Sequence, residues 1–414
     1  MFHRIDRCRI CGNTELIPLL HLGEQHLTGV FPRRRDAAVT CGPLELVKCH
    51  GPAACGLVQL HHSYDSSEMY GDNYGYRSGL NRSMVEHLQA KVAGLVARAA
   101  PAPGDLVLDI GSNDGTSLSF YPSNLTRVGM DPTAEKFRAH YQPGITAIAD
   151  FFSADTFRAH FGSRRAKIVT SISMFYDLPE PLRFVEQIAA ILADDGIWHL
   201  EQSYLLTMLS QNAYDTVCHE HLEYYGLAQI KWLTDRCGLQ ILNVTLNDVN
   251  GGSFAVTVGR AGAAHRPNTA AVERLLAAES AAGLHLLKPY EDFRHRVFEH
   301  RDRLLTLLAE LRSRHELVLG YGASTKGNVI LQFCGLTAAE IPAIAEVNPD
   351  KFGSFTPGSL IPIVSEAEAH ARRPDCFLVL PWHFRANLRA REAAFLARGG
   401  KMLFPLPEIE LTGA

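Results

Sequence analysis

The chain has 414 residues, of which 46% are hydrophobic and 20% charged, and its formal net charge is −4. At roughly 150 residues per domain this length predicts two or three domains, and the composition excludes a disordered chain. The charge argues against nucleic acid or an anionic membrane surface as a partner, and no apolar run approaches the roughly 18 residues of a membrane span. The first ten residues lack the apolar stretch of a secretory signal, so we expect a cytoplasmic protein with reduced cysteines.

The first 65 residues are predicted to form a small domain that is held together by a metal ion. Cys8-x2-Cys11, followed by Gly12, and Cys49-x5-Cys55 are two knuckle-like pairs. Four thiolates suit a tetrahedral zinc ion and leave no open position, which predicts a structural site. Cys41 and His50 are possible substitutes in the ligand set, and a group of small buried thiols is the simpler alternative.

Residues 66–262 carry the pattern of a parallel α/β domain. Apolar residues recur at helical spacing from Met84 to Val96, and Pro101 to Gly104 end that helix. Short apolar runs that alternate with helical stretches predict a parallel sheet. The expected strands are 106–110, 127–130, 167–172 and 196–200, followed by 239–246 and 253–258 with a hairpin loop at 247–252.

Residues 263–414 are predicted to form a helical linker and a second α/β domain. The stretch 267–315 is helical in pattern and is interrupted at Lys288-Pro289. A strand, a glycine turn and a helix start then follow within 316–327, and further strands are expected at 341–347, 376–380 and 401–404. The alternation favours a Rossmann-like domain.

A glycine turn after the first strand of the central domain predicts a cofactor site. The turn has the form Asp109-x-Gly111-x-x-x-Gly115, and Asp131 follows Gly111 by 20 residues, a distance that suits the hydroxyl groups of a ribose. A dinucleotide would need a helix N-terminus that faces a pyrophosphate, whereas polar side chains suit the amino-acid tail of S-adenosylmethionine. The alternative is an ordinary strand-to-helix turn. The predicted cofactor residues are Asp109, Gly111, Ser112, Asn113, Asp114, Gly115, Asp131, Asp150, Phe151 and Met174.

The segment 212–225 gathers acidic, imidazole and phenol groups around His219-Glu220-His221. The metalloprotease motif His-Glu-x-x-His is absent because position 223 is Glu. A His-x-His metal pair and a polar surface loop are the alternatives to a general base, which can take a proton from a carbon next to a carbonyl group. Tyr74 and Tyr76 could orient a sugar or stabilise an enolate oxygen, unless they belong to a tyrosine-rich surface loop.

The chain resembles the nucleotide-sugar C-methyltransferases of deoxysugar biosynthesis, and the similarity covers nearly its whole length. The matching stretches are Cys8-Arg-Ile-Cys11, Cys55-Gly-Leu-Val-Gln-Leu60, Ile110-Gly-Ser-Asn-Asp-Gly115, Asp215-Thr-Val-Cys-His-Glu-His221, Gly251-Gly-Ser253, Gly322-Ala-Ser-Thr-Lys-Gly327, Thr356-Pro-Gly358, Ile361-Pro-Ile363 and Leu380-Pro-Trp382. The resemblance implies a zinc-binding N-terminal domain, a central class I Rossmann-like methyltransferase domain that binds S-adenosylmethionine, and a C-terminal Rossmann-like domain.

The resemblance also implies roles for single residues. The substrate would be a nucleotide-linked 3-keto deoxysugar between the last two domains, with His221 as the base, Glu220 as the motif acid, and Tyr76, or else Tyr74, at the sugar. Cys218 stands where the family usually has Tyr, and Asp177 where it often has His. No Arg follows Gly251-Gly-Ser253, where the family commonly has one. These positions face the sugar in the family, so Asp177 and Cys218 are expected to contact the substrate, and a different sugar or acceptor is possible.

The glycine turn of the C-terminal domain carries Ser324, Thr325 and Lys326 at a helix start. We expect Ser324 and Lys326 to hold the diphosphate of the substrate, although the full Walker pattern is absent and a structural helix start with an exposed Lys is equally compatible. The predicted reaction is deprotonation of the sugar to an enolate, which attacks the sulfonium methyl group. The alternatives are an O- or N-methyltransferase of a small metabolite and a non-catalytic module that binds S-adenosylmethionine; the oligomeric state is left open.

Overall fold

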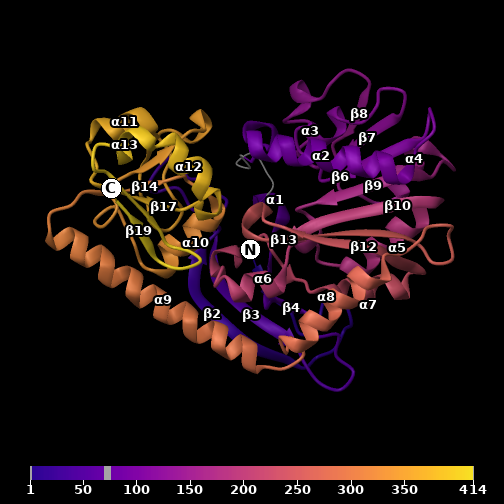
Figure 1. Ribbon diagram of the computed structural model, residues 1–414, viewed down its shortest axis with the longest axis horizontal. Helices are drawn as coiled ribbons and strands as arrows, with labels where there is room; N and C mark the ends of the chain where they lie inside the picture. Colours follow the sequence, from indigo (N-terminus) through magenta and orange to yellow (C-terminus); the bar gives the residue numbers. More distant parts are fainter. Residues whose placement is uncertain (1, 70–75, 414) are drawn as a thin grey trace.

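The computed structural model describes residues 2–69 and 76–413, which fold into four β-sheets with flanking helices. In Figure 1 the seven-stranded central sheet and the six-stranded C-terminal sheet lie on opposite sides of the molecule, and the N-terminal strands run below and between them. No helix in the described ranges combines the length and the apolar character needed to span a bilayer.

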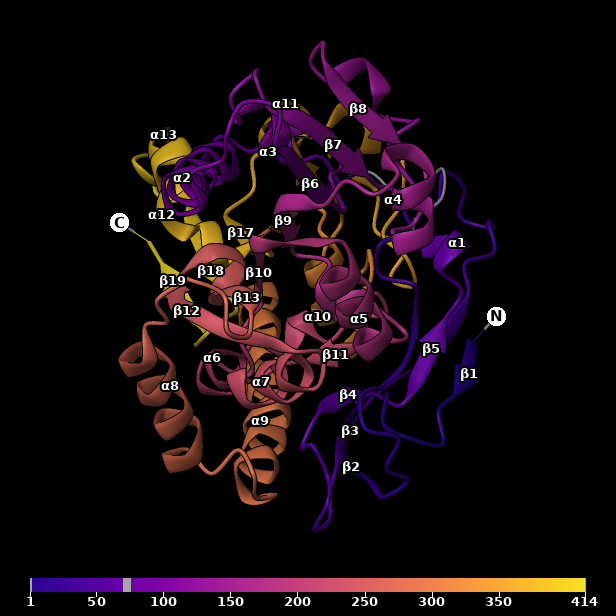
Figure 2. The same cartoon turned by 90° about the vertical axis from the view of Figure 1, so that its right-hand side faces the viewer.

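The N-terminal region forms a four-stranded antiparallel sheet of order β11-β4-β3-β2 and a two-stranded sheet of β1 and β5, which Figure 2 shows at one side of the molecule. Its elements are β1 (Phe2–Arg4), β2 (Leu16–His26), β3 (Cys41–Cys49), β4 (Val58–Leu60), β5 (His62–Tyr64) and α1 (Ser66–Met69). The fourth strand, β11 (Glu223–Tyr224), comes from the central region, where it directly follows His221-Leu222. The N-terminal sheet is therefore completed by the histidine segment.

The central sheet has the order β12-β13-β10-β9-β6-β7-β8, in which six strands run in the same direction and β13 runs antiparallel between β10 and β12. All six predicted strands are present, although β10 begins four residues earlier than expected. The strands are β6 (Leu106–Ile110), β7 (Thr126–Met130), β8 (Ile145–Ile148), β9 (Ala166–Ile172), β10 (Leu192–Ser203), β12 (Leu239–Asn247) and β13 (Ser253–Arg260).

Helices cover both faces of this sheet, as its apolar strands require. On one face α2 (Arg82–Ala99) packs Val92 and Leu95 against Val107 and Ile168. The other face carries α4 (Ala154–Phe161), α5 (Pro181–Ile191), α7 (Leu227–Arg236) and α8 (Thr269–Ala281). Short helical turns lie in the connections: η1 (Ser78–Leu80), α3 (Thr116–Ser119), η2 (Arg138–His140), η3 (Phe175–Asp177), α6 (Leu205–Ser210), η4 (Tyr214–Thr216) and η5 (Val249–Gly251).

The long helix α9 (Lys288–Ser313) leads to the C-terminal sheet and carries Pro289 in its first turn, where a proline is tolerated. The C-terminal sheet has the order β16-β15-β14-β17-β18-β19 and is parallel except for β19. Its elements are β14 (Val318–Tyr321), α10 (Thr325–Phe333), β15 (Ile344–Glu346), η6 (Pro349–Lys351), β16 (Ile363–Ser365), α11 (Glu366–Ala371), β17 (Cys376–Val379), η7 (Trp382–Phe384), α12 (Arg385–Arg391), α13 (Ala393–Leu396), β18 (Lys401–Phe404) and β19 (Glu410–Thr412).

Two apolar cores join the N-terminal region to the rest of the chain. One core combines Leu20 and Leu46 of the N-terminal sheet with Leu304 of α9 and with the strands of the C-terminal sheet. The other places Cys8 and Ile10 of the first knuckle against the core of the central sheet. The N-terminal region thus packs against both α/β units.

Candidate functional site

The first and second cysteine pairs meet in a single cluster. The Sγ atoms of Cys8, Cys11, Cys49 and Cys55 all lie within 4.8 Å of one another. The pairs Cys8–Cys55 and Cys11–Cys49 are 3.5 and 3.4 Å apart, close to the roughly 3.8 Å that a tetrahedral zinc ion with Zn–S bonds of about 2.3 Å requires. The residues therefore fit zinc, and four thiolates close its coordination sphere. Cys41 is exposed at the start of β3 and is outside the cluster, as is His50, and all nine cysteines are free thiols.

The glycine turn of the central domain follows β6 at the carboxyl edge of the sheet. Gly111 and Gly115 have φ values of 71° and 75°, a conformation that glycine adopts without strain. The side chain of Met174 covers Gly111, since a Cβ built there would lie 3.0 Å from Met174 Cγ. Two of the predicted cofactor residues, which are far apart in the sequence, are therefore in contact.

Two buried carboxylates flank this turn. Asp131 accepts hydrogen bonds from the backbone N of Asn113, at 2.8 Å, and from Thr133, so it lies beside the turn at the end of β7. Asp109 accepts a 2.5 Å hydrogen bond from Thr170 Oγ1, and burial raises its pKa to about 7 against the effect of that bond. Ser112 Oγ lies 2.8 Å from the phenol oxygen of Tyr141, which also donates to the Asn113 carbonyl.

A segment before α2 lies across the turn. The Asn113 side chain donates to the carbonyl of Tyr76 and accepts from the backbone N of Ser78, both at 3.0 Å, while Asp114 accepts from the backbone N of Gly79. Tyr76 is half exposed as a residue. The structure thus brings Tyr76 to the cofactor turn, whereas Tyr74 falls outside the described residues.

Asp150 and Phe151 lie just after β8, where the sequence places them. Both are exposed, and Asp150 accepts a hydrogen bond from the backbone N of Phe151. They lie on the same edge of the sheet as Asp109 and Asp131, because β8, β7 and β6 are parallel neighbours. A role in adenine recognition stays a prediction.

The three residues of the His-Glu-His segment have different surroundings. His219 is fully buried and its ring packs edge-on against Tyr64, with centroids 4.6 Å apart. Glu220 faces the N-terminal loop, where Thr28 Oγ1 lies 3.4 Å from its Oε2. A Cβ at Gly29 would collide with Glu220 Oε1 and lie 3.5 Å from Thr325 Oγ1 of α10. Glu220 therefore lies where all three regions of the chain meet.

The imidazole of His221 is held in one tautomer. Its Nδ1 lies 2.8 Å from the carbonyl oxygen of Thr216, and because a carbonyl only accepts, Nδ1 carries the proton and Nε2 has a free lone pair. The ring packs against Tyr176 with centroids 4.2 Å apart. Burial, followed by the positive charge of Lys326, lowers the pKa of His221 to about 3. The side chain is thus neutral and able to accept a proton at Nε2.

Two residues at which the sequence departs from the family pattern lie close to this histidine. Asp177 ends η3, directly after Tyr176. Cys218 is fully buried in the apolar core, and burial raises the pKa of its thiol well above its ordinary value. Both stay predicted substrate residues.

The C-terminal domain reaches this region through Lys326 and η7. Lys326 Nζ donates a 2.8 Å hydrogen bond to the carbonyl of Asn250 in the loop before β13. Trp382 packs over Gly251 in the same loop, and burial and the Lys326 charge lower the pKa of His383 to about 3. Ser324 caps α10 by accepting from the backbone N of Gly327. Of the two predicted diphosphate residues, Lys326 bridges the domains and Ser324 caps its helix.

Comparisons with known proteins give the family. A zinc binding domain model matches residues 8–70, a methyltransferase domain model matches residues 84–244, and a C-methyltransferase C-terminal domain model matches residues 248–407. The C-methyltransferase NovU of Streptomyces niveus is 31% identical over 415 residues, which cover 99% of this chain and 97% of that protein. The chain belongs to the C-methyltransferase family. It is an S-adenosylmethionine-dependent methyltransferase with a zinc-binding N-terminal domain.

Two solved structures resemble part of this C-methyltransferase. A methyltransferase in complex with the Trm112 activator of Haloferax volcanii is 18% identical, and the match covers 44% of this chain and 94% of that chain with a TM-score of 0.37. The plantazolicin methyltransferase BpumL is 11% identical over 44% of this chain and 88% of its own, with a TM-score of 0.36.

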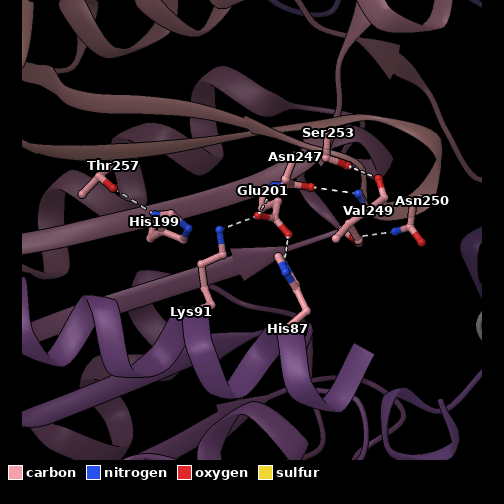
Figure 3. A network of polar contacts seen from close by, with 10 residues as sticks. His87, Lys91, His199, Glu201, Asn247, Val249, Asn250, Ser253 and Thr257 are labelled. Carbon is pink, nitrogen blue, oxygen red and sulfur yellow. Dashed lines mark hydrogen bonds and ion pairs between the residues drawn. The ribbon is translucent and has the colours of Figure 1, made fainter. Parts of the chain in front are cut away.

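A buried polar network supports the loop that receives Lys326 in the C-methyltransferase (Figure 3). Glu201 of β10 is 1% exposed and lies 2.5 Å from His87 Nε2 and 2.5 Å from Lys91 Nζ, both of α2. It also accepts a 2.9 Å hydrogen bond from Asn247, whose own Oδ1 accepts from the backbone N of Val249. Burial by itself would raise the pKa of the Glu201 carboxyl group. The contacts with His87 and Lys91 have the larger, opposite effect and lower the pKa to about 2. The network links α2, which follows the segment over the cofactor turn, to the loop that contacts the C-terminal domain.

Several residues of this site carry no local signal in the sequence. Trp382 carries no signal of its own outside the family motif Leu380-Pro-Trp382, although its indole donates a hydrogen bond to Asp215 of the histidine segment. The Glu201 network depends on contacts between residues up to 114 positions apart. The one signal in the sequence is a charged residue directly after a predicted strand, as Glu201 follows 196–200, because a charge that is buried needs a partner.

Proposed function

We propose that this C-methyltransferase transfers a methyl group to a carbon atom next to the ketone of a nucleotide-linked keto-deoxysugar, with His221 as the general base. The observation that carries the proposal is the bond between His221 Nδ1 and the Thr216 carbonyl, which leaves Nε2 free to accept a proton. His221 also lines a small cavity, close to the junction of the three regions of the chain.

Bound S-adenosylmethionine supplies an electrophilic methyl group. A carbon next to a ketone becomes a nucleophile when its C–H bond breaks, the proton passes to His221 Nε2 and the electron pair enters the enolate. The enolate carbon then forms the new C–C bond. A general base typically contributes about 10²–10⁴-fold, and positioning of the two reactants supplies much of the remainder.

The C-terminal domain supports binding of an anionic nucleotide portion. Lys326 lies at the start of α10 and carries a positive charge into the junction, where its field acts on His221, Asp215 and His383. We assign the diphosphate to Lys326 and Ser324, and the sugar to the surroundings of Tyr76, Asp177 and Cys218. Taken together, these assignments would locate the ketone of the sugar between the cofactor turn and His221.

Proton exchange tests the base separately from methyl transfer. The wild-type enzyme, incubated in D2O with S-adenosylhomocysteine and a nucleotide-linked keto-sugar, should introduce deuterium next to the ketone. H221A should lose this exchange by at least about 10²-fold and keep its affinity for S-adenosylmethionine in calorimetry. The matched control is H160A, which changes an exposed histidine of α4. Exchange at the wild-type rate in H221A would refute the assignment of the base.

The product then tests the acceptor atom. A panel of nucleotide-linked keto-sugars with unlabelled S-adenosylmethionine should give a product heavier by the mass of one CH2 group, since a methyl group replaces a hydrogen atom, and carbon NMR should show the methyl group on carbon. A methyl group on oxygen or nitrogen would overturn the proposal, and binding of the cofactor without S-adenosylhomocysteine formation would indicate a non-catalytic module.

A further inference from the structure

A buried ion pair connects the first zinc knuckle to the segment of the predicted base. Arg9 lies between Cys8 and Cys11, and its Nε is 3.6 Å from Oε1 of Glu223, two residues after His221. The side chains of Arg9 and Glu223 are 3% and 0% exposed. Removing one partner of such a pair leaves an uncompensated buried charge, which is strongly unfavourable.

Arg9 is fixed from several directions. Its Nη1 donates to the carbonyl of Leu60 at 2.6 Å, and its Nη2 donates to the carbonyl of His62 and to Ser63 Oγ at 3.2 and 2.8 Å. The neighbours of Arg9 in the sequence, Cys8 and Ile10, are packed into the core of the central sheet. The guanidinium group is planar and rigid. These contacts therefore also fix the direction of its remaining edge, which points toward Glu223.

Glu223 is attached to the N-terminal sheet by its backbone and lines the same cavity as His221. As part of β11 it pairs with Gln59 of β4. It also lines, together with His221, Thr216 and Tyr176, a small cavity of about 10 Å³, a volume that suits one water molecule. Neither carboxylate oxygen has a hydrogen-bond partner within the described ranges. The carboxyl group is thus available to a water or hydroxyl group in the cavity of the base.

We propose that Arg9 and Glu223 form a positioning pair for His221, in which the zinc knuckle fixes Arg9, Arg9 fixes the Glu223 carboxyl group, and Glu223 orders the cavity behind the imidazole. This inference rests on the proposed role of His221 as the base. It gives the zinc-binding domain a function in the reaction without placing the metal at the substrate. The four thiolates hold the loop in which Arg9 lies, and release of this loop removes the counter-charge of Glu223.

Variants of the pair separate this role from a general effect on folding. R9M leaves Glu223 unpaired, E223Q keeps its shape without the charge, and R9M/E223L removes both groups. The matched control is R7M, since Arg7 lies in the same part of the chain and forms an exposed ion pair with Asp6. Zinc content, melting temperature, and kcat and KM are measured for each purified protein.

We expect R9M to retain one zinc ion per chain and the wild-type KM for S-adenosylmethionine, but to lose at least tenfold in kcat, while R7M stays within twofold of the wild type. R9M/E223L should recover part of the melting temperature lost in R9M, because no unpaired charge remains. It should not recover the kcat, because the carboxyl group that orders the cavity is absent. If R9M lowers only the melting temperature, with kcat per zinc-loaded chain unchanged, the pair is structural and the inference is wrong.

The imidazole itself provides a readout that does not depend on the reaction. Nitrogen NMR of ¹⁵N-histidine-labelled protein, with the His221 signals assigned through H221A, reports the tautomer. R9M should change the Nδ1 and Nε2 signals of His221, and R7M should not. Unchanged signals in R9M would overturn the inference, whereas wild-type proton exchange in H221A would refute the proposed function and leave this test of the pair intact.

Discussion

The indole Nε1 of Trp382 donates a 2.7 Å hydrogen bond to Oδ2 of Asp215, and both side chains are buried. Trp382 belongs to η7 of the C-terminal domain, and Asp215 lies in η4 of the central domain, six residues before His221. Burial raises the pKa of Asp215, while Lys326 and the Trp382 bond oppose that shift. The bond therefore fixes the C-terminal domain directly against the turn whose carbonyl orients the predicted base.

Loss of this bond should impair the reaction more than cofactor binding. W382F removes the indole N–H and leaves a buried oxygen of Asp215 without its hydrogen-bond donor. Such a loss lowers the stability of the folded arrangement by about 1–3 kcal/mol. We expect a fall of at least tenfold in kcat/KM for the sugar and an unchanged dissociation constant for S-adenosylmethionine. The control is W232F, which alters a tryptophan of α7 that stacks with Arg236. Equal losses in both variants would contradict the domain-orienting role.

The pH dependence of kcat/KM should lack an acidic limb at the ordinary histidine pKa. A base must be unprotonated, so activity is lost as the pH falls through the pKa of His221 in the free enzyme. Burial and Lys326 lower that pKa from 6.5 to about 3, so activity controlled by His221 should stay level from pH 8 to about 5. K326M removes a positive charge, which should raise the pKa and move the limb upward. A wild-type midpoint near 6.5, or no upward shift in K326M, would refute this account.

Asp131 should be decisive for the cofactor. D131N replaces the carboxylate oxygen that accepts from the Asn113 backbone N and from Thr133, and it removes the charge predicted to bind the ribose hydroxyls. We expect S-adenosylmethionine to bind at least tenfold more weakly, or about 1.4 kcal/mol at 25 °C, as measured by calorimetry. E135Q alters a nearby exposed carboxylate that pairs with Arg138 and should leave affinity unchanged. Wild-type affinity in D131N would exclude the ribose assignment.

Zinc removal should destabilise the protein through its N-terminal domain. Because the four thiolates leave no open position, a chelator should lower the melting temperature and release one zinc ion per chain. C49S, which removes a ligand buried at the cluster, should bind less zinc, as measured by atomic absorption. C41S changes an exposed thiol outside the cluster and should keep full zinc content. Zinc loss in C41S equal to that in C49S would contradict the ligand set.

The elements with strong local patterns could be predicted from the sequence, and the contacts between domains could not. Buried runs such as Leu106–Ile110 read as strands because their residues suit the interior of a parallel sheet. The cysteine spacing indicated the metal cluster in the same way. In contrast, β11 has two residues and no periodicity, and the Arg9–Glu223 and Trp382–Asp215 contacts join positions 214 and 167 residues apart. Such contacts depend on how complete domains pack.

The two-residue strand β11 also affects any attempt to divide the protein. Without residues 223–224, β4 is the edge strand of the sheet in the zinc-binding domain. A fragment of residues 1–65 would therefore expose an unpaired strand edge. Such an edge invites pairing between copies, and the isolated fragment would be prone to aggregate even when loaded with zinc. An exchange of N-terminal domains between related enzymes would therefore have to transfer the histidine segment together with the cysteines.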